Sequence, residues 1–459
     1  MGREWIRHFF SGNPFTVIKE IREQEKLKLK EILEKHKELF DGDVGVIKES
    51  DVKVTLKSDA TPIFLKARPV AYALIPKIDK ELDSLIKKDI LYKVSHSDWA
   101  TPIVPVLKEN GDVRICADFK VTLNQRSEIV QHPLPSFNEV LYKLKNGKYF
   151  SKIDVKQAFH QLNVSEESRK YFTINTHRGL FRYKRLPFGF HGAPALWQES
   201  IEKILAGIDK VVAFMDDIII PGETEDENLR LTEEVLQRFE DFGIKVNKEK
   251  CEFLKTEMKC LGHVFTSNGV KMDPTKIKAL LEAPAPENVE QTKSWCGFVN
   301  YYRDFIPDLG NIMYPITRLL RKDFSFKWCF NCEQAFRKIK EIIASDIVLA
   351  PFNPSRKTII SCDASSYGYG AVFSQIDDKG IRRPVAFCSR VQSDTERKRS
   401  QFQKEAGVII YAIQYWHKLL WGFHFTIETD HKPLTGFFNP SKQMADTASM
   451  LMLRWQAIL

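Results

Sequence analysis

The chain has 459 residues, 43% of them hydrophobic, so it can bury a large core in two or three domains. Lysine and arginine number 69 against 60 aspartates and glutamates, a net charge of +9 that suits a phosphate-rich partner but is common among other proteins. No apolar run approaches the roughly 20 residues that cross a bilayer, and the N-terminus has no signal-peptide core. We therefore expect an intracellular protein without a membrane partner, in the cytoplasm or alternatively the nucleus.

The first elements are marked by charge and proline. Residues 19–40 are dense in lysine and glutamate with few apolar residues, which indicates a solvated linker helix with a thin apolar face. Pro62 and Pro69 flank an extended segment, and Pro76 opens a helix expected over 77–88.

Two aspartates in an apolar setting stand out further along. Strands expected at 211–213 and 218–220 flank Phe214-Met215-Asp216-Asp217, which places Asp216 and Asp217 in a tight hairpin turn. Such a pair costs free energy unless a cation compensates its charge. An ordinary Asp-rich surface turn is the alternative.

A third carboxylate favours a cation-binding site over an ordinary surface turn. Residues 150–154 indicate a strand that ends in Asp154 and is followed by the start of a helix. Asp154 would then lie at a strand end as well. Three carboxylates on one rim can hold two Mg²⁺ ions, the arrangement used in in-line phosphoryl transfer.

The C-terminal part contains a second acidic set. Proline-rich breaks are expected at 283–288 and 351–355, then antiparallel strands at 357–362 and 371–374 around a turn at Gly368 and Gly370, a helix at 401–420 and a strand at 423–429. Asp363 lies by the first of these strands, Glu405 on the helix and Asp430 at the end of the last strand. Glu405 shares the inward face of its helix with Ile409 and Ala412, where an acid argues for a metal.

The eight cysteines form neither a disulfide framework nor a zinc pattern. Cys329 and Cys332 are a single C-x-x-C without a second pair or a nearby histidine, so we expect reduced cysteines rather than a metal site.

Ordered motifs carry a family resemblance. The segments around Asp154 and Asp216, with Arg185-Leu186-Pro187-Phe188-Gly189 between them, resemble the palm motifs of reverse transcriptases, closest to the Pol polyprotein of gypsy-type LTR retrotransposons. Further segments similar to that family are 99–104 and 114–120 in the fingers, 243–251 in the palm, Leu261-Gly262-His263 as the primer grip, 298–307 in the connection, and 362–365 and 429–434 in RNase H.

The resemblance implies an α+β fold: a right-hand polymerase with fingers, palm and thumb or connection, followed by an incomplete RNase H-like α/β domain. Its implied parts are an N-terminal extension at 1–60, fingers and palm at 61–283, thumb and connection at 284–350, and the RNase H-like domain at 351–459. Residues 1–6 are similar to the closing helix of a retroviral-type protease, so we expect a region truncated at both ends.

The resemblance also assigns roles to residues of the polymerase site. Asp154 and Asp216 would coordinate two Mg²⁺ ions, with Asp217 as the auxiliary ligand. Lys108 and Arg114 are candidates to hold the deoxynucleoside triphosphate, although both could be solvated surface cations, Lys108 more so. Lys250 is a candidate general acid for pyrophosphate, in competition with Lys245 and Lys248. The expected nucleotide pocket comprises Val155, Phe188, Gly189 and Phe159, whose ring would occlude a ribose 2′-hydroxyl.

In the same way Asp363, Glu405 and Asp430 match the order of the RNase H carboxylates, but the family's fourth carboxylate would lie past residue 459. We therefore expect weak or absent nuclease activity. The function indicated is an RNA-directed DNA polymerase that uses an RNA template, a DNA primer and an RNA-DNA hybrid. The alternative is a decayed or domesticated retroelement fragment that binds nucleic acid without useful catalysis.

Overall fold

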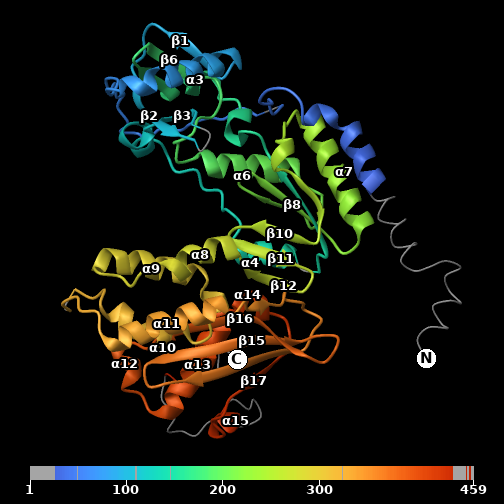
Figure 1. Cartoon of the computed structure of the whole chain (residues 1–459), viewed down its shortest axis with the longest axis vertical. Coiled ribbons are helices and arrows are strands. Elements are labelled where there is room, and N and C mark those ends of the chain that lie inside the picture. Colours follow the sequence, from blue (N-terminus) through green and yellow to red (C-terminus); the bar gives the residue numbers. More distant parts are fainter. Residues whose placement is uncertain are drawn as a thin grey trace, which may run out of the picture. The chain divides into compact units, whose positions relative to one another are not determined.

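The computed structural model describes residues 26–48, 50–108, 111–144, 146–322, 324–437, 451 and 454–455. Contacts divide the chain into two compact units, Met1–Thr256 and Glu257–Leu459 (Figure 1). The boundaries expected at 60, 283 and 350 would divide it further and stay predictions. Among the described residues, no helix has the length and apolar character needed to span a membrane.

The first unit contains two sheets. A five-stranded sheet has the order β1-β6-β5-β2-β3, with strands Leu91–Val94, Gly179–Tyr183, Thr173–Thr176, Thr101–Leu107 and Val113–Ala117. A four-stranded sheet has the order β7-β8-β4-β9, with strands Val212–Phe214, Asp217–Gly222, Tyr149–Asp154 and Glu252–Lys255. The labelled α-helices of this unit are α3 (Ile75–Lys87), α4 (Phe137–Lys143), α5 (Glu166–Arg169), α6 (Ala193–Ile204) and α7 (Glu225–Phe242).

The helix expected at 77–88 is α3, which begins with Pro76 in its first turn. Its buried residues Ile78, Leu82 and Leu85 recur at helical spacing on one face, and α3 packs on β1 and β3 with that face.

The four-stranded sheet is the frame of the first acidic set. Ile153 of β4 and Ile218 and Ile220 of β8 are fully buried in the core of this unit. Helices α6 and α7 lie along this sheet in Figure 1 and contact β7 and β8 respectively. Helix α7 is capped at both ends: Thr224 accepts a hydrogen bond from the Glu227 N–H, and Gly243 ends it in the left-handed conformation.

The charged helix expected at 19–40 is helical over 26–35, while 19–25 lie outside the described residues. It is docked rather than free, because Lys28 pairs with Asp226 at 2.8 Å and Lys35 with Glu233 at 2.6 Å on α7. Its thin apolar face, including Ile32, packs against the core.

The second unit also contains two four-stranded sheets. One has the order β10-β11-β12-β13, with strands Glu257–Cys260, His263–Thr266, Gly269–Met272 and Val348–Leu349. The other has the order β16-β15-β14-β17, with strands Arg382–Val391, Gly368–Ile376, Thr358–Ala364 and Phe425–Glu428. The α-helices are α8 (Pro274–Glu282), α9 (Val289–Tyr301), α10 (Leu309–Arg318), α11 (Phe330–Ala344), α12 (Asp394–Arg397), α13 (Gln401–Tyr415), α14 (His417–Leu420) and α15 (Pro433–Phe437).

Two expectations for this unit were wrong in detail, and one strand was missed. Gly368 and Gly370 lie inside β15 and not in a turn, since the chain turns between Ala364 and Gly368. Strand β16 was not expected at all. The helix expected at 401–420 ends at Tyr415 and is followed by the separate short helix α14. Both proline-rich breaks are confirmed, between α8 and α9 and between β13 and β14.

Candidate active site

Strand pairing brings the first acidic set together. Asp154, the last residue of β4, lies opposite Asp217, the first residue of β8. The Val155 N–H donates to the Asp216 carbonyl oxygen at 2.9 Å, which ties the turn to the end of β4. The predicted convergence of Asp154, Asp216 and Asp217 at one sheet edge is therefore confirmed.

The hairpin turn is one residue earlier than expected. It consists of Met215 and Asp216, because Asp217 already pairs with Phe214 as part of β8. Met215 has a positive φ of 53°, a conformation that side chains other than glycine adopt at a cost. Two buried side chains of α6 hold this turn: Trp197 Nε1 donates to the Met215 carbonyl at 2.6 Å, and Gln198 Nε2 donates to the Ala213 carbonyl at 2.9 Å.

The electrostatics of the site distinguish the three carboxylates. Burial, then the charges of Asp154 and Asp217, raise the pKa of Asp216 to about 6. Burial also raises the pKa of Asp154, partly offset by Lys250, whose Nζ is 3.9 Å from Asp154 Oδ2. Asp217 Oδ2 instead forms an ion pair with Lys152 Nζ at 2.8 Å. Among the described residues, no hydrogen bond or ion pair reaches the Asp216 carboxylate.

These residues fit a magnesium site that is completed by its substrate. Within the described part of the chain, no group of three or more histidine, cysteine, aspartate or glutamate side chains is arranged to hold a metal ion by itself. A closed cage is not expected for Mg²⁺, which usually takes one or two carboxylates plus substrate phosphates. The pKa of Asp216 is raised first by burial and then by the charges of Asp154 and Asp217, and a divalent cation would compensate this negative charge.

Arg114 links two aromatic rings to the acidic set. The ring centroids of Phe159 and Phe188 are 5.3 Å apart, and the Arg114 guanidinium lies 5.1 Å from the Phe188 centroid. The charge of Arg114 also lowers the pKa of Asp216, so this cation is close to the acidic set. Lys108 is not shown near it; its Nζ lies 4.0 Å from Glu81 Oε1.

Backbone geometry shapes this pocket. The helix expected after Asp154 is a short 3₁₀ helix, Ala158–Gln161, that the chain enters through Gln157 in the left-handed conformation. Gly189 has a φ of +97°, and a Cβ there would lie 2.3 Å from the Ala117 carbonyl oxygen, so only glycine fits. Val155 is buried at 2% exposure, so its side chain belongs to the core.

Two residues of this region were missed by the sequence analysis. His160 is buried against the Phe188 ring at 4.9 Å, and burial, with the charge of Arg114 next, lowers its pKa to about 3. Asn247 donates its N–H to the Asp154 carbonyl at 2.8 Å, and its side chain also bonds the Asp154 carboxylate. No pattern in the sequence marks either residue, because both act through contacts with distant segments.

The lysines near the site can now be separated. Lys245 donates to the Glu38 carbonyl and is therefore engaged elsewhere. Lys250 is the one that lies beside Asp154. The geometry favours Lys250 over Lys245 as the candidate general acid.

The segment expected as the primer grip is a turn in the second unit. Leu261 and Gly262 link β10 to β11, both with positive φ, as in a type I′ turn. Tyr301 Oη donates to the Leu261 carbonyl at 2.5 Å, and Tyr302 Oη donates to the Gly262 carbonyl at 3.0 Å. His263 is buried, and its Nδ1 lies 2.6 Å from the Leu261 carbonyl oxygen, so it supports the turn from inside.

The second acidic set also converges. Glu405 on α13 is only 3% exposed, as the helical spacing predicted, whereas Asp363 on β14 and Asp430 after β17 are exposed. Burial raises the pKa of Glu405 to about 7, and the charges of Asp430 and Asp363 add to that effect. Gln401 Nε2 donates to Glu405 Oε1 at 2.6 Å, while Glu405 Oε2 has no hydrogen-bond partner among the described residues.

A fourth acid belongs to this neighbourhood. Asp308 precedes α10, and after burial the charge of Asp363 is what raises its pKa. The sequence gave no reason to connect these two aspartates, because they lie on segments far apart along the chain. The orphaned Glu405 Oε2 and the oxygen donor set both fit a divalent metal at this edge of the sheet.

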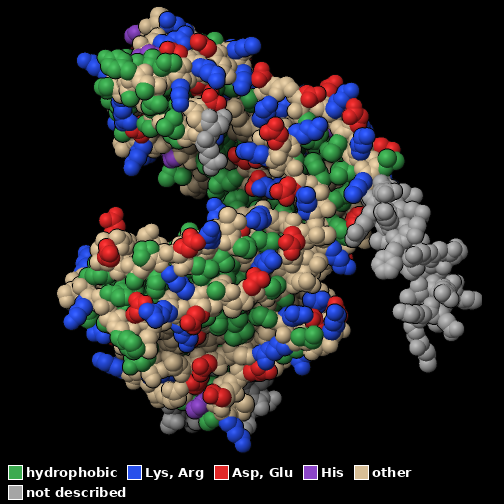
Figure 2. All heavy atoms as spheres, in the orientation of Figure 1, with side chains coloured by type: hydrophobic (Ala, Val, Ile, Leu, Met, Phe, Trp, Pro, Cys, Tyr) green, Lys and Arg blue, Asp and Glu red, His purple; other side chains and the backbone are tan. Residues whose placement is uncertain are grey.

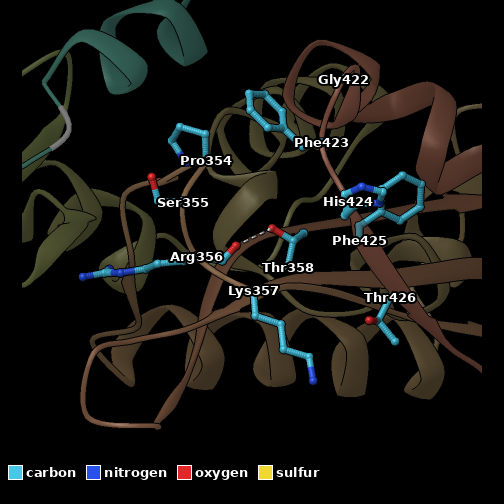
Figure 3. A pocket seen from close by; sticks show the side chains of 10 residues that line it. All are labelled: Pro354, Ser355, Arg356, Lys357, Thr358, Gly422, Phe423, His424, Phe425 and Thr426. Carbon is cyan, nitrogen blue, oxygen red and sulfur yellow. Dashed lines mark hydrogen bonds between the residues drawn. The ribbon is translucent and has the colours of Figure 1, made fainter.

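A pocket of about 390 Å³ lies elsewhere on the same sheet. Figure 3 shows its lining residues, which come from the start of β14 around Lys357 and Thr358 and from the start of β17 around Phe425. Asp363 and Asp430 lie towards the other ends of these two parallel strands, so the pocket is not part of the acidic set.

Comparison with known proteins identifies a domain around each of the two acidic sets. Residues 106–265 match the model of reverse transcriptase (RNA-dependent DNA polymerase), and residues 328–427 match that of the RNase H-like domain found in reverse transcriptase. The retrovirus-related Pol polyprotein from transposon 412 of Drosophila melanogaster is 32% identical over 403 residues, which are 85% of this chain and 32% of that protein. The opus polyprotein of the same species is 34% identical over 85% of this chain and 41% of that protein. The Tf2-3 polyprotein of Schizosaccharomyces pombe is 30% identical over 90% of this chain and 31% of that protein.

Solved structures confirm the expected fold. A foamy viral protease-reverse transcriptase in complex with double-stranded DNA has a TM-score of 0.83 at 22% identity, over 95% of this chain and 76% of that chain. The same kind of protein in complex with an RNA/DNA hybrid has a TM-score of 0.77 at 22% identity, over 95% and 59%. The chain spans less than half the length of the Pol polyproteins named above. It carries a reverse transcriptase domain followed by an RNase H-like domain, and it is homologous to the Pol polyproteins of retrotransposons.

Proposed function

We propose that this chain is an RNA-directed DNA polymerase that transfers deoxynucleotides onto a primer 3′-hydroxyl. The observation that carries the proposal is the convergence of Asp154, Asp216 and Asp217 at one sheet edge, inside the segment that matches the reverse transcriptase model. The raised pKa of Asp216 supports a cation there.

Asp154 and Asp216 are the residues that would hold two Mg²⁺ ions. When bound, these ions would lower the pKa of the primer hydroxyl and neutralise the negative charge of the triphosphate and of the pyrophosphate that leaves. Asp217 is fixed by Lys152, which suits a residue that shapes the site more than it binds metal. Lys250, which lies beside Asp154, would give a proton to the pyrophosphate oxygen as the bond to the α-phosphorus breaks.

The nucleotide would be held and selected by the residues next to the carboxylates. The Arg114 guanidinium can bind a phosphate, while the Phe188 ring holds the Arg114 side chain in place. Phe159, packed on Phe188, would occupy the space that a ribose 2′-hydroxyl needs. Lys108 forms an ion pair with Glu81 at 4.0 Å, and its role in holding the triphosphate stays a prediction.

The proposed partner is a nucleic-acid duplex of template and primer. The foamy viral proteins similar in fold were solved with double-stranded DNA and with an RNA/DNA hybrid. Figure 2 shows basic and acidic side chains interspersed over the visible face, so we expect binding through local phosphate contacts that weaken as salt rises.

The test is extension of a DNA primer on an RNA template by the wild type and by Asp216→Asn, with primer-template affinity measured in parallel. Asp209→Asn is the matched control, because Asp209 is an exposed turn residue of the same unit. We expect extension to be lost only in Asp216→Asn, with affinity kept in all three proteins. Binding without extension by the wild type would favour the alternative, a retroelement fragment that no longer catalyses.

A second candidate activity is hydrolysis of RNA in an RNA-DNA hybrid. It is favoured by the electrostatic coupling of Glu405 with Asp363 and Asp430 and by the orphaned Glu405 Oε2. That this activity is weak stays a prediction. The test compares hybrid degradation by the wild type, Asp363→Asn and the exposed control Asp378→Asn; equal degradation by all three would exclude the assigned site.

A further inference from the structure

The C-x-x-C pair lies at the start of helix α11 with its two sulfurs close together. Cys329 is the N-cap residue and Cys332 lies in the first turn, and their Sγ atoms are 3.5 Å apart. A disulfide needs an S–S distance of about 2.05 Å between residues at this spacing, so small side-chain rotations are enough to form one. The pair is therefore poised for oxidation without a change in the fold.

The two thiols differ in the way that a redox-active pair requires. Cys329 is exposed, whereas Cys332 is 1% exposed and its Sγ lies 3.5 Å from the Pro315 carbonyl oxygen. The backbone N–H of Cys332 at the helix start, followed by the Cys332 side chain, lowers the pKa of the Cys329 thiol, while burial raises that of Cys332. Cys329 thus resembles an attacking thiol and Cys332 a protected resolving thiol.

Cys329 and Cys332 both line a cavity of about 580 Å³. Its charged lining residues are Arg318 and Lys327, and no carboxylate is among the lining residues in the described part of the chain. The Arg318 guanidinium lies 4.3 Å from the Phe324 ring centroid, and among the described residues it forms no ion pair with an acid. The cavity therefore suits a small anionic molecule placed against Cys329.

We propose that Cys329 and Cys332 form a redox-active dithiol that exchanges with a small carboxylate-bearing disulfide, of the class of oxidised glutathione, bound in this cavity. The Cys329 thiolate attacks one sulfur of the disulfide, whose S–S bond breaks and releases one thiolate. Cys332 then loses its proton to solvent and attacks Cys329 Sγ, which breaks the mixed disulfide and releases the second thiolate. Two protein thiols are oxidised, and one small disulfide is reduced to two thiols.

The test exposes the full chain to oxidised glutathione, alkylates the remaining thiols and locates each modification by peptide mass spectrometry. The wild type should form a Cys329–Cys332 disulfide, and Cys332→Ala should accumulate glutathione on Cys329. Cys329→Ser, which keeps a favourable N-cap, should leave Cys332 unmodified. Cys296→Ala, which removes a buried thiol of α9, should behave as the wild type.

The cavity is tested separately with Lys327→Gln. This change should slow the reaction with oxidised glutathione several-fold and leave the reaction with neutral 2-hydroxyethyl disulfide unchanged. If Lys327→Gln slowed both reactions equally, or slowed neither, the proposal that the substrate is anionic would be overturned. The dithiol assignment would be overturned by a wild type that stays reduced in excess oxidised glutathione, by modification of Cys332 in Cys329→Ser, or by release of bound zinc on oxidation. If Cys332→Ala does not fold, the wild type and Cys329→Ser decide the question.

Discussion

Asp154 and Asp217 are direct partners across the antiparallel strands β4 and β8. This one pairing fixes the acidic site, because the turn that precedes Asp217 must then place Asp216 beside the end of β4. Lys152, two residues before Asp154 on the same face of β4, neutralises Asp217. Asp216 is left as the carboxylate whose negative charge is least compensated, and the predictions for the polymerase site depend mainly on it.

The three carboxylates should differ in their effect on nucleotide incorporation. We expect Asp154→Asn and Asp216→Asn each to lower the rate by roughly 10²–10³-fold or more, as for other groups that stabilise transition-state charge. Asp217→Asn should cost less, because its charge is already balanced by Lys152. Single-turnover incorporation of one nucleotide measures all three. Equal losses would show that Asp217 binds metal as directly as the others.

Activity should depend on pH through Asp216. Its pKa is raised to about 6, and the protonated acid cannot bind metal, so the incorporation rate should fall as pH drops through about 6. Because Mg²⁺ competes with the proton, the midpoint should move to lower pH as the Mg²⁺ concentration rises. Rate profiles at two Mg²⁺ concentrations check this. A midpoint that does not move with Mg²⁺ would assign the profile to another group.

Glu405 should make the metal-free protein less stable at high pH. Its pKa is about 7 in the fold against an ordinary value of 4.5, so the folded state holds a proton that the unfolded state has lost. Stability must then fall as pH rises from about 4.5 to about 7. Glu405→Gln cannot ionise, so its thermal midpoint in EDTA should exceed that of the wild type by a few degrees at pH 8 and by almost nothing at pH 4.5. The reverse order would contradict the raised pKa.

Phe159 should govern the choice between deoxyribonucleotides and ribonucleotides. Phe159→Ala removes the ring that packs on Phe188, and we expect discrimination against ribonucleotides to relax by about 10- to 100-fold. Phe159→Tyr keeps the ring and should keep the discrimination. The ratio of kcat/KM for the two nucleotides is the measurement, and unchanged discrimination in Phe159→Ala would remove this residue from the pocket.

The turn at Leu261 should depend on Tyr301. Tyr301→Phe deletes the hydrogen bond to the Leu261 carbonyl, so it should cost about 0.5–1 kcal/mol of unfolding free energy and weaken primer-template binding. Tyr72→Phe, at a tyrosine that is 91% exposed, is the control and should change neither. Weaker binding in both variants would point to a general loss of stability.

The sequence was sufficient where a local pattern decided the structure. The segment that ends in Asp154 and the apolar runs around Asp216 indicated their strands, and the helical spacing of Glu405 with Ile409 predicted its inward position. The position of Asp217 in β8 was missed, because register depends on the distant partner β4.

Glycine was misleading for a similar reason. Gly368 was assigned to a turn, but it lies in β15, where the glycine is needed because a Cβ would be 2.3 Å from Asn311 Oδ1 on α10. Strand β16 was overlooked because Arg382-Arg383-Pro384 begins it, a charged and proline-containing start that is typical of a loop or an edge strand. For Gly368 a packing partner far along the chain overrides the local preference, whereas β16 pairs with the preceding strand β15 and tolerates its proline at the edge of the sheet.

The most direct test of the central claim is to locate the divalent metal itself. Fe²⁺ that replaces Mg²⁺ in the complex with primer-template and nucleotide generates hydroxyl radicals, which cut the nearest backbone. We predict cuts next to Asp154 and within residues 214–217, suppressed by excess Mg²⁺ and absent from Asp216→Asn but present in Asp209→Asn. Cuts at these positions that persist in Asp216→Asn, or Mg²⁺-sensitive cuts in the first unit that fall only elsewhere, would contradict the assignment of this acidic set as the polymerase metal site.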